Sequence, residues 1–190
     1  MRYLIRTATI PNLPSPAGPD MLLEIHAAWQ KQVDIATKSD KTSVGSIAFQ
    51  PLPRHVIRET ERRGGTPMNF KEELGDHIII EMDISWTKGR SDKQIYDAGT
   101  GITAQIDSLY QTKFKGQKAT NMKQLSVVDQ SPLSNATAST DGYLPIFAND
   151  ATWDQGVYRS YKDYEKLGQI QKKYDPDGFF SKRTNGWRFS

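Results

Sequence analysis

Apolar and polar residues alternate most clearly in the stretch HIIIEMDISW, residues 77–86. Because successive side chains of a strand point to opposite faces, period two sorts this segment into two sets. One set is apolar and predicts a face that packs against a core; it comprises Ile78, Ile80, Met82, Ile84 and Trp86. The other set carries Glu81 and Asp83, about 7 Å apart by strand rise. That second face either meets water or lines a cavity that uses acid–base groups.

The same patterns predict the other elements along the chain. We expect strands at residues 2–9, 42–50 and 142–149, and amphipathic helices at 20–38, 54–63, 90–115 and 155–174. Gly99 and Gly101 weaken the middle of the third helix by about 1 kcal/mol each relative to Ala. Residues 116–141 are rich in Ser, Thr, Asn, Gln and Lys, which predicts a long mobile surface loop.

Strands and helices therefore alternate, an order that usually indicates a parallel sheet. The polar face of residues 77–86 argues against that arrangement, because parallel sheets are covered on both sides. We predict an α+β fold over residues 1–190, a single domain. It would have an antiparallel or mixed sheet of about four or more strands, with helices packed on one face as in a ferredoxin-like layer. The opposite face would then be open to a ligand or a partner.

The amino-acid composition excludes several kinds of site and partner but does not identify a reaction. The 190-residue chain has no cysteine, so disulfides, thiolate metal sites and cysteine nucleophiles are excluded. Its net charge of +3 is dispersed, which argues against a nucleic-acid partner. No apolar run reaches the length of about 20 residues needed to cross a membrane, and the N-terminus does not match a signal peptide. We expect a soluble, cytoplasmic protein.

Motifs for phosphate, metal or triad chemistry are missing from the sequence. No glycine-rich phosphate cradle follows a predicted strand. The three histidines, His26, His55 and His77, lack metal-ligand spacing, so no metal is expected. Carboxylates, tyrosines and amides remain as candidates for catalysis.

Two stretches resemble a known family. SIAFQPLPRHVIRETERRGGTPMNF and LPIFANDATWDQGVYRSYKDYEKLGQIQKKYDPDGFFSKRTNGWRF are similar to the C-terminal half of fungal FAD-linked oxidases of the berberine bridge enzyme type. The order of the motifs also matches, so the resemblance covers essentially the whole chain. It implies a substrate domain in which an antiparallel sheet, backed by helices, lies with its open face over the flavin ring.

The chain departs from this family in two respects. Family members often have Asn-Tyr in the fourth strand, where the Tyr can act as a base, but this sequence has Asn149 and Asp150. The family binds FAD mostly through an N-terminal domain that this chain lacks, so the expected cofactor is none. The uncovered sheet face would invite pairing, and we expect a homodimer, or else a pocket between the sheet and the loop at 116–141 that binds a small molecule.

Three functions remain open at this point. The first is a flavin-independent enzyme of fungal specialised metabolism that cyclises, isomerises or dehydrates a polyketide- or terpenoid-like small molecule. The second is an FAD-dependent oxidoreductase fragment or subunit, with FAD as its cofactor. The third is a non-catalytic small-molecule-binding or scaffold protein.

The first function assigns roles to particular residues. Glu81 and Asp83 would be the acid–base pair, with burial raising one pKa, and Asp150 a further catalytic group. Alternatively, Glu81 and Asp83 lie on a solvated face, and Asp150 and Asp154 cap the last helix. The predicted substrate-binding residues are Gln50, Tyr143, Phe147, Asn149, Trp153 and Tyr158.

Overall fold

The computed structural model describes residues 1–122 and 142–183 of the chain. Its strands and helices are β1 (Arg2–Pro11), α1 (Ala17–Ser39), β2 (Val44–Leu52), α2 (Arg54–Arg62), β3 (His77–Trp86), α3 (Asp92–Leu109), α4 (Tyr164–Tyr174) and α5 (Phe179–Arg183). A π-helical turn, Tyr110–Phe114, continues α3. No helix in the described ranges combines the length and apolarity needed to cross a membrane.

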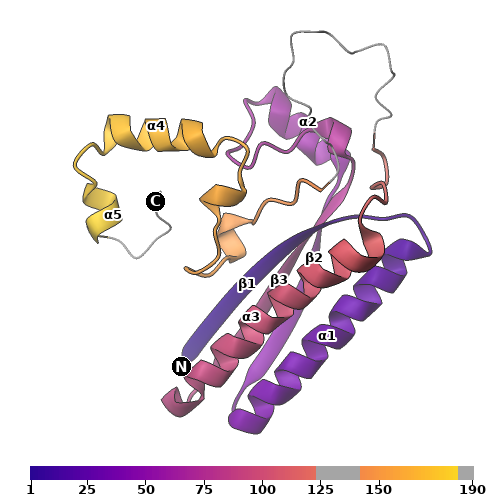
Figure 1. Ribbon diagram of the computed structural model, residues 1–190, viewed down its shortest axis with the longest axis vertical. Coiled ribbons are helices and arrows are strands. Elements are labelled where there is room, and N and C mark those ends of the chain that lie inside the picture. The colour runs from indigo at the N-terminus through magenta and orange to yellow at the C-terminus, as the bar shows by residue number, and fades with distance from the viewer. Residues whose placement is uncertain (123–141, 184–190) are drawn as a thin grey trace.

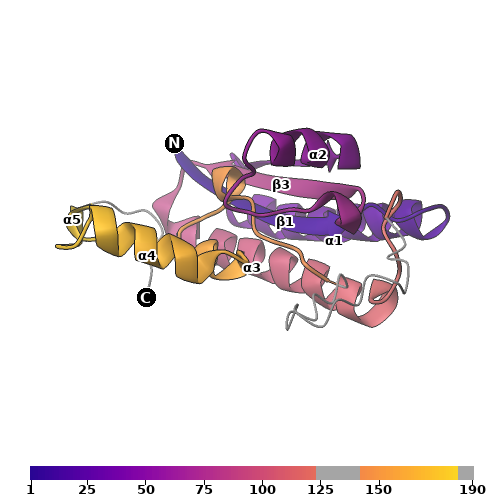
Figure 2. The same cartoon turned by 90° about the horizontal axis from the view of Figure 1, so that it is seen from above.

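The described strands form one antiparallel sheet in the order β1-β3-β2. Both outer strands pair antiparallel with β3, so β1 and β2 run parallel to each other with β3 between them. Figure 1 shows α1 and α3 lying side by side along this sheet, and Figure 2 shows α2 on the side away from α3. The α+β class and the antiparallel sheet are thus confirmed.

One face of β3 packs under α1 and α3, as its alternation predicts. Ile80, Met82 and Ile84 are at most 1% exposed and belong to the main hydrophobic cluster. The buried residues of α1 follow three–four spacing, which places them on a single helix face; they are Gly18, Met21, Ile25, Trp29, Gln32 and Ala36. Burial against this layer, rather than intrinsic helix propensity, is what stabilises the two helices.

Gly99 has a packing role that its helix propensity does not suggest. A Cβ atom at this position would lie 2.6 Å from Cδ2 of Leu4 and 2.9 Å from Cδ of Arg6. The glycine therefore lets α3 approach β1 more closely than any other residue would. Gly99 lowers the helix propensity of α3, but it does so at the position where α3 packs against β1.

The prediction of a fourth strand at residues 142–149 is wrong. This segment is irregular and ends in a short 3-10 turn, Ala148–Asp150. Pro145 has no N–H to give to a ladder, and its carbonyl accepts a hydrogen bond from the Thr9 hydroxyl at 2.5 Å. The N–H of Ile146 donates to Ser160 Oγ at 2.9 Å. Side chains, not a strand ladder, hold the segment, so the described sheet has three strands rather than four or more.

The last predicted helix begins later than expected. Residues 155–163 form turns and a 3-10 helix, Tyr158–Ser160, and α4 starts only at Tyr164. Val157 and Tyr161 are buried in a small cluster of their own, which fixes this region in a non-helical path. No residue of α4 is buried, and Figure 1 shows α4 and α5 standing away from the sheet.

Most of the predicted loop at 116–141 lies outside the described residues. Its first part is held in place: the N–H of Thr120 donates to the Asn12 carbonyl at 2.8 Å. The N–H of Asp76 in turn donates to the Thr120 carbonyl at 2.9 Å. Backbone hydrogen bonds thus tie Thr120 to the chain beside the ends of β1 and β3, and the mobility of the loop at 116–141 stays a prediction.

Asp40 fastens the C-terminal end of α1 to the chain leaving β3. Its buried carboxylate accepts hydrogen bonds from the N–H groups of Thr42, Thr87 and Lys88 and from the Thr42 hydroxyl. Although desolvation opposes ionisation, these donors together hold the pKa of Asp40 well below its usual 3.8.

We expect Asp40→Asn to lower stability at neutral pH, because an amide cannot accept all of these hydrogen bonds. A folded-state pKa below the unfolded value adds stability above the unfolded pKa and loses it as pH falls. The gap between wild type and variant should thus be full above pH 3.8 and shrink as pH falls below it. Urea unfolding at a series of pH values measures this. A gap of constant size would contradict the assigned role, and Asp34→Asn, an exposed Asp on α1, is the control.

Candidate active site

Glu81 and Asp83 lie on the sheet face that α1 and α3 leave uncovered. Both side chains are half-buried rather than fully solvated. The register places Thr7 of β1 and Ala48 of β2 directly beside Glu81. The nearby Asp83 carboxyl group is one of the causes that raise the pKa of Glu81.

Asp150 joins this pair from a distant part of the sequence. It is 3% exposed, and the amide of Gln50 links it to the sheet. The Nε2 atom of Gln50 donates to Glu81 Oε2 at 2.9 Å and to Asp150 Oδ2 at 3.1 Å. Asn149 Nδ2 donates to the other Asp150 oxygen at 2.9 Å. The structure thus brings together three carboxyl groups and two amides, all of which the sequence proposed as site residues.

Asp83 is held by two hydroxyl groups from the flanking strands. Tyr3 on β1 donates to Asp83 Oδ1 at 2.5 Å, and Ser46 on β2 donates to Oδ2 at 3.3 Å. Desolvation, followed by the hydrogen bond to Asp83, raises the pKa of Tyr3 to about 12. Tyr3 therefore remains a protonated donor at any physiological pH. The sequence placed Tyr3 in the first strand but gave no sign that it meets Asp83, because strand register cannot be deduced from one sequence.

Negative charge accumulates at Glu81. Burial raises its pKa, and the charges of Asp150 and then Asp83 raise it further, while the Gln50 hydrogen bond opposes the rise. None of the ion pairs within residues 1–122 and 142–183 involves these three carboxyl groups. Their geometry also does not form a metal-binding group among the described residues. A carboxyl group whose pKa is raised beside other carboxyl groups is suited to general acid–base catalysis.

Two of the other predicted substrate-binding residues, Tyr143 and Tyr158, have partners outside this group. The Tyr143 hydroxyl donates to the Met68 carbonyl and accepts from the Lys162 N–H, and its ring packs edge-on against Phe70. Tyr158 packs edge-on against Tyr161. Among the described residues no hydrogen bond joins either tyrosine to the acids. Phe147 is half-buried, and Trp153 is 71% exposed.

The alternative of Asp150 and Asp154 as helix caps does not fit the structure. Asp163 occupies the N-cap position of α4, and Asp154 instead forms an ion pair with Arg6 at 2.9 Å. Asp150 is the last residue of its short 3-10 turn, and it lies beside Glu81, to which the Gln50 amide links it. Both aspartates therefore act in tertiary contacts rather than at a helix end.

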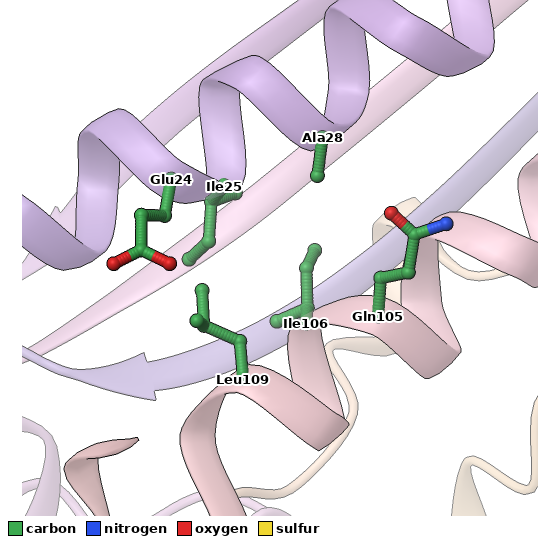
Figure 3. A pocket seen from close by; sticks show the side chains of 6 residues that line it. All are labelled: Glu24, Ile25, Ala28, Gln105, Ile106 and Leu109. Atoms are coloured by element: carbon green, nitrogen blue, oxygen red, sulfur yellow. The ribbon is translucent and has the colours of Figure 1, made fainter. Parts of the chain in front are cut away.

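A cavity of about 160 Å³ lies between α1 and α3, away from the acids. Figure 3 shows the residues that α1 and α3 turn toward each other there; they are Glu24, Ile25, Ala28, Gln105, Ile106 and Leu109. A smaller cavity of about 20 Å³, beside His77 and Tyr143, has room for a single water molecule. Burial lowers the pKa of His77, so this ring is neutral at pH 7.

Comparison with known proteins places the chain near fungal flavoenzymes. No protein-family model matches the sequence, and no solved structure matches it. The FAD-dependent monooxygenase tpcD of Cochliobolus heterostrophus is 26% identical over 161 residues, 83% of this chain and 26% of that protein. The FAD-dependent monooxygenase FUP4 of Fusarium proliferatum is 24% identical over 174 residues, 87% of this chain and 28% of that protein.

A third relative, an FAD-linked oxidoreductase of Arthroderma benhamiae, is 25% identical over 148 residues, 76% of this chain and 25% of that protein. The chain thus spans about a quarter of the length of the curated relatives that it matches. Its sequence is similar to one region of fungal FAD-linked oxidoreductases and FAD-dependent monooxygenases, and these relatives are enzymes.

Proposed function

We propose that this chain is an enzyme of fungal specialised metabolism that moves protons on a small molecule bound at the open sheet face. The observation that carries this proposal is the convergence of Glu81, Asp83 and Asp150 on one surface, with the pKa of Glu81 raised. The substrate would be polyketide- or terpenoid-like. The reaction would be a cyclisation, isomerisation or dehydration, which requires orientation and proton transfer rather than a redox cofactor.

The geometry suggests a division of roles. Glu81 is the general acid, because its raised pKa keeps it protonated to a higher pH than an ordinary glutamate. Asp83, oriented by Tyr3 and Ser46, accepts the proton that the substrate loses. Asp150 raises the pKa of Glu81 through its negative charge. The amides of Gln50 and Asn149 hold Asp150 and orient the substrate's oxygen atoms.

The described residues do not fit FAD on their own. Phosphate groups bind at glycine-rich loops and helix N-termini. The two long helices that follow strands, α1 and α3, instead carry Asp20 and Asp92 in their first turns. The carboxyl groups of the open face would also repel a pyrophosphate. We therefore assign no catalytic step to a flavin.

A second function is favoured by the names of the relatives. They are FAD-dependent monooxygenases and FAD-linked oxidoreductases, so this chain would act in oxidation if another polypeptide segment supplied the flavin site. In that case Glu81, Asp83 and Asp150 would exchange protons with the substrate. The segment that supplied the flavin site would face the same open sheet surface. A homodimer that covers the open face is the corresponding proposal for the flavin-independent enzyme.

The functions are distinguished by incubating the purified protein with candidate polyketides and terpenoids in D₂O. Proton-transfer chemistry predicts deuterium incorporation or product formation without added FAD, measured by mass spectrometry. Turnover only when FAD or a flavoprotein is added would favour the oxidoreductase. Ligand binding with neither deuterium incorporation nor turnover would identify a binding protein and contradict both enzyme assignments. Sedimentation of the same sample tests for the dimer.

A further inference from the structure

The segment that carries Asp150 is fastened to β1 by a side chain that sequence analysis did not single out. Gln155 is 8% exposed and lies near the end of the irregular segment that precedes α4. Its Nε2 atom donates to the Thr7 carbonyl at 2.8 Å, and its Oε1 atom accepts from the Thr7 N–H at 3.1 Å. One amide therefore satisfies both backbone groups of a single residue, as a neighbouring strand would.

This contact explains how the edge of β1 is closed without a fourth strand. An edge strand leaves backbone N–H and C=O groups unpaired, and buried ones need partners. Thr7 is 1% exposed, and the Gln155 amide supplies the partners that a strand ladder would supply. The same Oε1 atom also accepts from the Thr152 N–H at 3.3 Å, which ties Gln155 to its own segment.

The contact between Gln155 and Thr7 lies beside Glu81, the candidate general acid. In the sheet register Thr7 is directly opposite Glu81. Asp150, earlier in the same segment, reaches the Gln50 amide that also bonds Glu81. Figure 1 shows this segment, in orange, running beside β1 before it reaches α4. The Gln155–Thr7 contact thus anchors the segment that carries Asp150 at the strand position opposite Glu81.

A neighbouring ion pair closes the same edge but does not replace the amide. Arg6 Nη1 lies 2.9 Å from Asp154 Oδ2, with the two side chains 6% and 31% exposed. Arg6 points to the helix side of the sheet, where its Cδ lies against Gly99. Its Nε is buried without a hydrogen-bond partner in the described part of the chain. The ion pair therefore anchors the segment from the opposite face, whereas Gln155 anchors it at the backbone level of Glu81.

We infer that Gln155 is a positioning residue that holds Asp150 against Glu81 by pairing with the backbone of Thr7. This inference rests on the proposed function, since it matters only if Glu81 works as an acid. Gln is suited to the position because its amide combines one donor and one acceptor. Glu would place an oxygen instead of the N–H donor against the Thr7 carbonyl, and Met of similar length would offer neither a donor nor an acceptor.

The test is Gln155→Met, with carbon-detected NMR titration of the Glu81 carboxyl group in the purified chain. Asp150→Asn should lower the Glu81 pKa toward its ordinary value, because it removes the largest charge that raises it. Gln155→Met should lower it in the same direction, because Asp150 is released. In the double variant the two changes should not add, since both act by removing the Asp150 charge.

The outcomes separate this inference from the proposed function. If Asp150→Asn lowers the Glu81 pKa and Gln155→Met leaves it unchanged, the positioning role is overturned while the proposed function stands. If wild-type Glu81 titrates as an ordinary glutamate, the proposed function is overturned. The positioning role is then decided by the backbone amide order parameters of residues 148–152. If Gln155 positions Asp150, these order parameters fall in Gln155→Met. If they stay unchanged, the positioning role is overturned. Ile102→Val, a core change on α3, controls for general loosening.

Discussion

Replacing Ile80 with alanine should lower the free energy of unfolding by about 2–5 kcal/mol. Ile80 lies in the central strand β3, is 0% exposed and belongs to the main hydrophobic cluster. Its neighbours in the sheet are Ala8 on β1 and Phe49 on β2, so the deleted atoms leave a cavity between strands and helices that cannot easily collapse. Urea denaturation followed by circular dichroism measures the loss.

Val44→Ala provides the matched control for this prediction. Val44 is a β-branched residue of the edge strand β2 and is 66% exposed, so its truncation should change stability by no more than about 0.5 kcal/mol. A loss below 1 kcal/mol for Ile80→Ala, or equal losses for the two variants, would mean that α1 and α3 do not cover this face of the sheet in solution.

Local patterns predicted the elements with short-range causes. Strict alternation in residues 77–86 identified β3 and the face on which Glu81 and Asp83 lie, because period two is a property of the strand itself. Three–four spacing likewise identified most of α1 and the whole of α3. The helix that ends before Gly64 was also predicted nearly to its last residue, since glycine with positive φ stops a helix.

The same local sequence patterns did not predict the structure of segments that are held by contacts with distant parts of the chain. The alternation in LPIFAN resembles a strand, yet Pro145 and the hydroxyls of Thr9 and Ser160 hold it in an irregular path. The apolar spacing after Gln155 resembles a helix, but the Gln155 amide is committed to β1. Both errors have one cause: tertiary hydrogen bonds to this segment outweigh its local preference.

The candidate site was predicted in part for the same reason. Gln50, Asn149 and Asp150 were named as site residues, and the structure brings them to Glu81. Tyr3 and Ser46 were missed as partners of Asp83. Predicting these contacts requires knowing which strands flank β3 and in which register they pair with it. Tyr143 was expected at the site, but its hydroxyl is used between Met68 and Lys162.

Glu81→Gln should lower the rate of the proposed proton transfer by about 10²–10⁴-fold. Glutamine keeps the size of the side chain and can still meet the Gln50 amide, but it has no acidic proton to give. The reaction rate in D₂O, or product formation where a substrate is known, measures the effect. Glu24→Gln is the matched control: this glutamate bonds Lys113 at 2.6 Å on the helix side of the sheet and should leave the rate unchanged.

The pH dependence distinguishes an acid at Glu81 from a residue that only shapes the surface. A general acid with a raised pKa works below that pKa and loses activity as pH rises through it. Asp150→Asn removes a negative charge that raises the pKa of Glu81, so it should move this alkaline limb to lower pH. The same shift has a counterpart in stability: a carboxyl pKa raised by folding means that the folded state binds more protons, so stability falls as pH rises through the titration. An alkaline limb that stays in place in Asp150→Asn, or that survives in Glu81→Gln, would assign the proton to another group.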